Sequence, residues 1–512
     1  METEKITSSY RKSVGSAQAL VDVVLQREDE NSISKVLSNT ARAYVDEIEI
    51  LNGEAHYSGG VVFDCLYVDE QGTSHTIVGN ADLNGKIEEP SLNPLTKPIY
   101  SVEVVEVKVD SLDDERVKLS GVIEIKMDVV ATEEFDEVKV GDDNIQLLKE
   151  TVKQFNVVSS GTKTFCLNEE FEVKSKINKI LLSNAQAFLK NTSSGTGYFT
   201  VEGEMFLNAL LQVETDEGMA LKNLMETINF KEELEDELIQ KDDMVYAFIY
   251  IRPQDLSVTI AGDSQAENPT NAVAVSATIT VKYVALRETE NEIYVDAFSR
   301  TNKTNIVTES FDVAKNVKSE NFSATIEGQT IIGEEEARIA KVVGVANEHI
   351  SVANSSVTEN ELTIEGIAYA SVIYMTDDDT PTLSSVELEI PFSNKFDVQD
   401  MSSDGIFVVA SVKDIDVKAK KGKEINATLD VNFAVDTYQT DTNVLIKDIE
   451  LTEELVPADY SLQIYIAPEG STLWDVAKHL LVSEDVLMAQ NPDLVFPLEQ
   501  SQSVVYFNQR TK

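Results

Sequence analysis

The clearest pattern along the chain is an alternation of apolar and polar residues with a period of two, which is typical of β-strands that bury one face. Three long stretches carry it: GGVVFDCLYVDE (59–70), GEMFLNALLQVETD (203–216) and GIAYASVIYMTDDD (366–379). On one face of each stretch, every second residue is apolar or aromatic: Val61, Phe63, Cys65 and Tyr67; Met205, Leu207, Ala209 and Leu211; Ala368, Ala370, Val372 and Tyr374. The opposite face has one polar position in each stretch: Asp64, Asn208 and Ser371. The pattern predicts three related and mostly buried strands.

A short motif precedes each of these strands, with the sequences ISKVL (33–37), INKIL (177–181) and IAKVV (339–343). The motif isoleucine and the glycine at the expected start of the strand are separated by 59−33 = 26, 203−177 = 26 and 366−339 = 27 residues. Two features that recur three times at one spacing indicate an internal repeat. The repeat steps, 203−59 = 144 and 366−203 = 163 residues, have the size of a domain.

The motif lysines Lys35, Lys179 and Lys341 have two interpretations that the sequence leaves open. A lysine on a strand edge can pair with a nearby acid and discourage edge-to-edge association. Alternatively, the three lysines make a recurring contact between modules.

A second apolar and alternating region follows in each repeat, at 117–130, 272–286 and 425–438, and is rich in Val, Ile and Thr. Two stretches look helical instead, QLLKETVKQF (146–155) and part of KNLMETINFKEELEDELI (222–239). The predicted fold class is therefore mainly β, with three tandem β-sandwich-like modules followed by a small βααβ domain. The expected bounds are listed in chain order: 13–152, 153–316, 320–452 and 459–508.

The βααβ prediction rests on a change of pattern after residue 459. The strand SLQIYI leads through the turn APEG to Thr472, which can cap a helix with Asp475 as its capping-box acid. The residues that follow have the 3.6-residue period of one helical face: Leu473, Val476, Ala477 and Leu480. Ser483 can cap a second helix that stops at Asn491-Pro492, and SVVYF supplies the last strand.

Composition narrows the classes of function. The chain has 512 residues, and its 90 acidic against 42 basic side chains give a net charge of −48. This charge disfavours binding to nucleic acid and to anionic membranes. We see no signal peptide and no apolar run long enough for membrane insertion, so a cytoplasmic protein is expected. Cys65 and Cys166 are expected to be reduced and buried.

No residues form a recognisable catalytic or metal-binding constellation. None of the four histidines, His56, His75, His349 and His479, has a partner at metal-ligand spacing. No glycine-rich phosphate loop is present. We therefore expect a protein that is not an enzyme, with no catalytic residue, no cofactor and no metal.

The three copies of the Ile-x-Lys-aliphatic motif, each with its glycine, long apolar strand and acidic turn, resemble the SPOCS repeat. This repeat occurs in spore coat assembly proteins of clostridia and related spore formers. The resemblance covers about 430 residues and implies a role in sporulation.

The C-terminal segment resembles the LysM domain through Gly470, Thr472, Leu473, Ala477, Leu487, Asn491 and Pro492. LysM domains usually bind N-acetylglucosamine polymers such as peptidoglycan in a shallow groove. The resemblance implies a groove with Gly470, Ser471, Thr472, Leu473 and Trp474 on one side and Asn491, Pro492, Asp493 and Leu494 on the other. Two departures from the family pattern, Ser471 and Ser501-Gln502, weaken the expectation of sugar binding. Trp474, the single tryptophan, is either packed within the module or an exposed anchor for a partner.

The two resemblances together imply a non-enzymatic scaffold for the spore coat, in the mother-cell cytoplasm at the forespore surface. In such proteins the LysM module docks onto the ATPase of the coat's basement layer, and the other modules contact further coat proteins. The alternative is a protein that binds peptidoglycan and attaches to the cell wall or the spore cortex.

Overall fold

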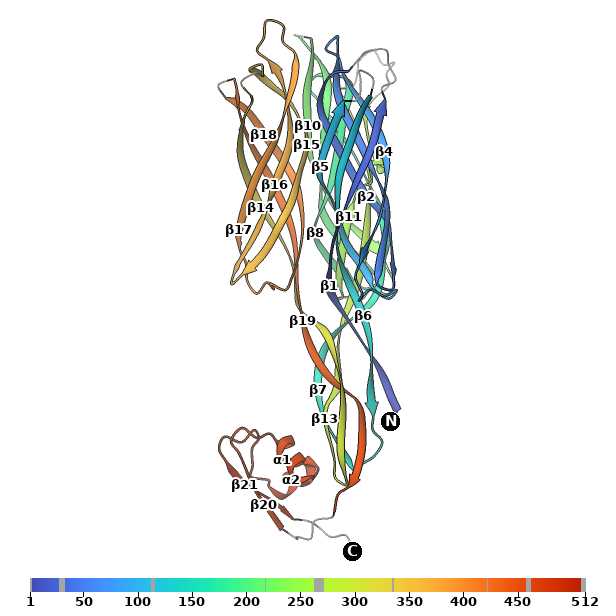
Figure 1. Cartoon of the computed structure of the whole chain (residues 1–512), viewed down its shortest axis with the longest axis vertical. Helices are drawn as coiled ribbons and strands as arrows, with labels where there is room; N and C mark the ends of the chain where they lie inside the picture. The colour runs from blue at the N-terminus through green and yellow to red at the C-terminus, as the bar shows by residue number, and fades with distance from the viewer. Residues whose placement is uncertain are drawn as a thin grey trace.

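The computed structural model describes residues 2–26, 33–111, 116–216, 218–261, 271–333, 336–420, 422–456 and 462–507. The molecule is mainly β, and its strands gather into an elongated body with a narrower stalk below it (Figure 1). A small unit that contains both α-helices lies beside the lower end of the stalk (Figure 1).

Unit 1 of the body is a sandwich of two antiparallel sheets. One sheet has the order β2 (Ile33–Leu51), β3 (Glu54–Asp69) and β4 (Ser74–Glu88). The other contains β1 (Glu2–Gln26), β6 (Arg116–Lys139) and β5 (Lys97–Ser111) in the order β1, β6, β5. The Ser9–Phe155 pair between β1 and β7 (Ile145–Glu172) joins it to the second sheet of unit 2 as one seven-stranded sheet. Apolar side chains of β3 and β6 meet between the sheets and form the core, among them Phe63, Cys65, Leu119 and Ile123.

Units 2 and 3 have the same arrangement. In unit 2 the first sheet contains β8 (Lys176–Gly195), β9 (Tyr198–Thr215) and β10 (Gly218–Glu235). Its second sheet contains β7 (Ile145–Glu172), β13 (Ala272–Ser299), β11 (Met244–Tyr250) and β12 (Leu256–Ala261), with the short helix η1 (Pro253–Asp255) between the last two. In unit 3 the sheets are β15 (Ile339–Thr358), β16 (Glu361–Thr376) and β17 (Leu383–Asp397), and β14 (Asn302–Ile331), β19 (Glu424–Glu454) and β18 (Gly405–Lys420).

The burial predicted from the period-two pattern is confirmed. All twelve apolar residues named on the inner faces of β3, β9 and β16 are at most 2% exposed. The opposite faces of the same strands are also covered, because the three units pack against one another there. Leu66, Leu210 and Ile373 meet in one cluster, together with Leu37 and Leu181 from the motif strands. This shared cluster explains why the central strand of each unit is apolar on both faces.

Both stretches predicted to be helical are strands, so that prediction is wrong. Residues 146–155 lie within β7, which pairs with β13 along its whole length, and residues 222–235 lie within β10, which pairs with β9. Cross-strand ion pairs such as Lys149–Glu292 (2.8 Å) and Lys153–Glu288 (2.7 Å) use charges that also suit a helix surface. Long-range pairing overrides local helix propensity here.

The repeat glycines lie inside their strands and not at the start, each five residues after the first residue of β3, β9 or β16. Opposite each glycine the partner strand has a bulge, at Val45/Glu47, Leu189/Asn191 and Val352/Asn354. A Cβ added to Gly59, Gly203 or Gly366 would lie only 2.0–2.2 Å from a backbone carbonyl oxygen of that partner strand. Close backbone approach therefore requires glycine at this position.

The motif lysines lie on β2, β8 and β15, which are edge strands of their sheets, and all three are exposed. Lys35 donates a hydrogen bond to Ser384 Oγ of unit 3 (2.5 Å), which is a contact between units. Lys179 and Lys341 have no side-chain partner within the described parts of the chain. Only Lys35 therefore shows the contact between units, and the described residues show no acid paired with Lys179 or Lys341.

The stalk consists of the N-terminal ends of β1, β7 and β14 and the C-terminal ends of β6, β13 and β19, paired as three antiparallel ladders. Its core includes Phe135, Val152, Ile293, Phe311 and Leu445, so every unit contributes. Cys65 is buried as expected, but Cys166 is exposed on β7, and the expectation of burial was wrong there. Both cysteines are free thiols.

Candidate functional site

The C-terminal unit folds from β20 (Leu462–Ala467), α1 (Leu473–Leu480), α2 (Glu484–Gln490) and β21 (Gln502–Phe507), in that order. The two strands pair antiparallel, and the unit has its own core around Ala477, Leu487 and Val504. The predicted capping box is present: Thr472 Oγ1 accepts from Asp475 N–H at 3.1 Å, and Asp475 Oδ2 accepts from Thr472 N–H at 2.9 Å. Ser483 is the N-cap of α2, but its side chain makes no capping hydrogen bond.

The first side of the predicted groove is a tight turn. Gly470 has a φ of 80°, a left-handed conformation that favours glycine. Its N–H donates to Leu498 O (2.8 Å), and Leu498 N–H donates to Ser471 O (3.0 Å). These bonds hold the turn against the loop before β21. Gly470 and Thr472 are exposed, whereas Ser471 and Leu473 are half-buried.

The second side of the groove contains one fully engaged amide. Asn491 is 9% exposed, and its Nδ2 donates to Leu487 O (2.9 Å) and Val505 O (2.7 Å). Its Oδ1 accepts from Val505 N–H (2.9 Å), so the side chain joins the end of α2 to β21. Pro492 and Asp493 are exposed and Leu494 is half-buried. The surface open to a ligand is therefore formed by Gly470, Thr472, Pro492 and Asp493.

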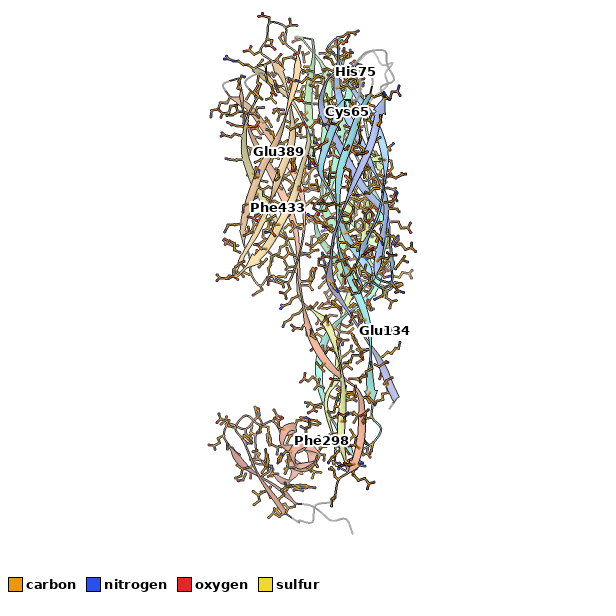
Figure 2. All side chains as sticks on the ribbon, viewed as in Figure 1. Cys65, His75, Glu134, Phe298, Glu389 and Phe433 are labelled. Carbon is orange, nitrogen blue, oxygen red and sulfur yellow. The ribbon has the colours of Figure 1, made fainter. Side chains whose placement is uncertain are left out.

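Trp474 is 6% exposed and covered by the stalk. Its ring lies 5.1 Å from the ring of Phe298, at the end of β13 (Figure 2). The indole Nε1 donates to Asp296 Oδ2 at 2.7 Å. One turn further along α1, Lys478 Nζ contacts both carboxylate oxygens of Asp296 at 2.7 Å. Trp474 therefore joins the C-terminal unit to the stalk, and is not an exposed anchor in this arrangement.

Asp296 is the charged centre of this contact. Burial raises the pKa of its carboxyl, but hydrogen bonds from Lys478 and Trp474 outweigh burial and hold the pKa below its usual range. The carboxylate is thus ionised at neutral pH and binds both donors. Sequence reasoning missed Asp296 and Phe298. Asp296 follows an irregularity in the pairing of β13 with β7, and such a bulge has no signal in a single sequence.

A second surface of the C-terminal unit is apolar. One face of the β20–β21 sheet packs on the helices, and Tyr465 on that face stacks on His479 with ring centroids 4.1 Å apart. The other face exposes Leu462, Ile464, Ile466 and Phe507, which are 46%, 61%, 69% and 51% exposed. We call these four residues the outer β20 face. Clustered exposed apolar side chains often mark an interaction site.

The described residues contain no group of three or more His, Cys, Asp or Glu side chains that could hold a metal ion. Within the same described ranges, no helix is long and apolar enough to cross a membrane.

Comparison with known families identifies part of the chain. The family described as "SipL, SPOCS domain" matches residues 338–420, which contain β15 to β18 of unit 3. This match supports the SPOCS-like character of that unit and points to a coat-related role. No curated protein and no solved structure is significantly similar to the chain.

Proposed function

We propose that this chain is a non-enzymatic scaffold of the spore coat, and that its C-terminal unit is a LysM module that docks onto the ATPase of the coat's basement layer. The protein would act in the mother-cell cytoplasm at the forespore surface and recruit further coat proteins through its β units. The observation that carries the proposal is the SPOCS match at residues 338–420. Because units 1 and 2 have the same arrangement of sheets, we extend the SPOCS assignment to them.

The outer β20 face supports docking onto a protein partner. Burying a large apolar side chain contributes about 1.5–3 kcal/mol, so four such residues give a substantial contact. By contrast, the amide of Asn491 is engaged and Trp474 is covered, so two residues of the predicted sugar groove are not available to a glycan. These two contacts favour the scaffold over the alternative of peptidoglycan binding.

The test uses the full chain and two immobilised partners, the purified basement-layer ATPase and peptidoglycan from the same organism. Ile466→Asp places a charge on the outer β20 face. Ile331→Asp at the end of β14 is the matched control, because both isoleucines are 69% exposed. The proposal predicts saturable binding to the ATPase that weakens at least about tenfold in Ile466→Asp and is unchanged in Ile331→Asp. Saturable binding to peptidoglycan without binding to the ATPase would contradict it.

A further inference from the structure

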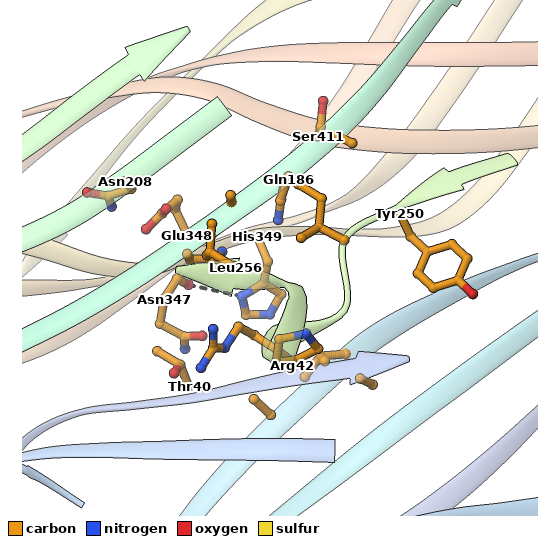
Figure 3. Close-up of a pocket in the computed structure, with 18 of the residues that line it drawn as sticks. Thr40, Arg42, Gln186, Asn208, Tyr250, Leu256, Asn347, Glu348, His349 and Ser411 are labelled. Carbon is orange, nitrogen blue, oxygen red and sulfur yellow. Dashed lines mark hydrogen bonds between the residues drawn. The ribbon is translucent and has the colours of Figure 1, made fainter. Parts of the chain in front are cut away.

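A cavity of about 250 Å³ lies where the three β units meet. Its lining includes residues of β2, β8 and β15, the three strands that begin with the lysine motif (Figure 3). Arg42, Gln186 and His349 hold equivalent places in the three repeats. In the strand pairing, Arg42 lies opposite residue 62, Gln186 opposite residue 206 and His349 opposite residue 369. Each of these three partners is the third residue after its repeat glycine. We call this space the junction cavity.

The third repeat departs from the other two at this cavity. Its motif isoleucine and its glycine are 27 residues apart, against 26 in the other copies. The pairing of β15 with β16 explains the difference, because β15 has an additional bulge between Ala346 and His349. Asn347 within the bulge has a φ of 56°, in the left-handed region. The bulge directs Asn347, Glu348 and His349 to the cavity, and bulges of this kind commonly re-aim side chains at functional sites.

The side chains around the cavity leave hydrogen-bonding capacity unused. Arg42 donates to Asp64 Oδ2 (2.8 Å) and to Ser183 O (3.3 Å), but its Nε has no partner among the described residues. The same is true of Ser411 Oγ and of His349 Nε2, whose ring is fixed by Nδ1 against Asn347 O at 3.0 Å. The protein alone therefore does not complete this polar network.

Charge around the cavity is nearly balanced. Arg42 pairs with Asp64, and Glu103 pairs with Lys126 at 2.9 Å. Burial lowers the pKa of His349, which favours the neutral imidazole. Burial also raises the pKa of Glu348, which accepts a hydrogen bond from Asn208. An anion or a cation would upset this balance, whereas a neutral molecule would not.

We propose that the junction cavity binds a small, neutral, polyhydroxylated molecule with the size of one sugar or cyclitol ring. A hydroxyl group both donates and accepts, so it can satisfy the mixture of Gln186, Asn184, Glu348 and Arg42. The volume is below the range of about 300–1,000 Å³ for drug-sized ligands and suits a single ring. Ala187 and Leu210 supply apolar lining for the C–H faces of such a ring. Because all three units line the cavity, the ligand would join them.

The test is isothermal calorimetry of the full chain with glucose, N-acetylglucosamine and myo-inositol, and with acetate and methylammonium as charged comparators. At least one neutral polyol is expected to bind saturably at one site, and more tightly than either comparator. Gln186→Ala should weaken this binding about tenfold. Ala187→Leu, which adds bulk at one lining residue, should weaken it, whereas Ala419→Leu on the exposed side of β18 should not change it.

Three results would overturn the proposal. Absence of binding by every polyol would mean that the cavity holds water only. Stronger binding of a charged comparator would refute the chemical class. Loss of binding in Asp493→Lys, with retention in Gln186→Ala, would place the sugar in the groove of the C-terminal unit. If Ala187→Leu does not fold, Gln186→Ala alone decides, because its amide has no hydrogen-bond partner within the described protein.

Discussion

Arg11 is the residue whose replacement tests the packing of the three units most severely. Its side chain is 1% exposed, with Nε 2.9 Å from Asp128 Oδ2 of unit 1 and Nη1 2.6 Å from Asp436 Oδ2 of unit 3. The guanidinium also lies over three rings of units 2 and 3, at 5.1 Å from Tyr246, 5.0 Å from Phe407 and 5.1 Å from Tyr438. One side chain therefore contacts all three units.

The perturbation is Arg11→Met, which removes the charge but keeps much of the volume. Removing one partner of a buried ion pair costs about 3–5 kcal/mol, because the other charge remains buried. Asp128 is that residual charge, since it is only 3% exposed. Loss of the contacts with the rings adds to the cost, so we expect the free energy of unfolding to fall by at least about 3 kcal/mol at neutral pH.

The loss of folding stability caused by Arg11→Met should depend on pH. Burial raises the pKa of Asp128 even in the presence of Arg11, whose charge lowers it. Without Arg11 the folded-state pKa rises further. A group whose folded-state pKa exceeds its unfolded value of about 3.9 stabilises the fold fully below that value and loses this contribution as pH rises. Arg11→Met should therefore be more destabilising at pH 8 than at pH 5.

Urea unfolding followed by circular dichroism at both pH values measures this effect. Lys5→Met on the same strand is the control, because the Lys5–Glu134 pair is exposed (68% and 45%) and should contribute at most about 1 kcal/mol. Arg11→Met/Asp128→Leu should recover much of the loss, since an apolar pair can replace a buried ion pair. A cost for Arg11→Met no larger than that for Lys5→Met, or one that does not depend on pH, would refute the reasoning.

Three further predictions follow from local contacts. Gly203→Ala should lower the free energy of unfolding by about 1–3 kcal/mol, because its Cβ would lie 2.2 Å from Phe188 O. Gly141→Ala, with nothing within 4 Å, should leave urea unfolding nearly unchanged, and equal effects would contradict the explanation. Asp296→Ala should release the C-terminal unit from the stalk and increase the radius of gyration in small-angle X-ray scattering. An unchanged radius of gyration in this variant would refute the contact. Because the pKa of Asp296 is lowered, the contribution of its carboxylate to docking is present above about pH 3.9 and is lost as pH falls through the lowered pKa. Burial raises the pKa of Cys65 to about 12, so iodoacetamide should label the exposed Cys166 and spare Cys65 in the native chain. Mass spectrometry that detects similar labelling of both cysteines would contradict this.

Local patterns along the chain were sufficient to predict the buried faces of three strands and the capping box of α1 in the C-terminal unit. The alternation at 59–70, 203–216 and 366–379 identified side chains that are fully buried, and Thr472 with Asp475 forms the expected capping box. Both features depend on residues close in sequence, so a single sequence contains them. The repeat glycines were also found, but the reason for them, a bulge on the partner strand, was not.

Features that join distant segments could not be predicted. Arg11, Asp128 and Asp436 meet only when units 1 and 3 pack together, and no local pattern relates them. The same holds for Trp474 and Asp296, which are 178 residues apart. At 146–155 the local signal was misleading, because Lys and Glu at helix-like spacing pair across strands instead.

Fluorescence microscopy of the tagged chain in sporulating cells of its own organism tests the central claim, a scaffold that docks through its C-terminal unit. The account predicts a shell of fluorescence around the forespore for the native chain and for Ile331→Asp, and diffuse fluorescence in the mother cell for Ile466→Asp. A shell that persists in Ile466→Asp, or fluorescence of the native chain at the cell wall, would contradict it.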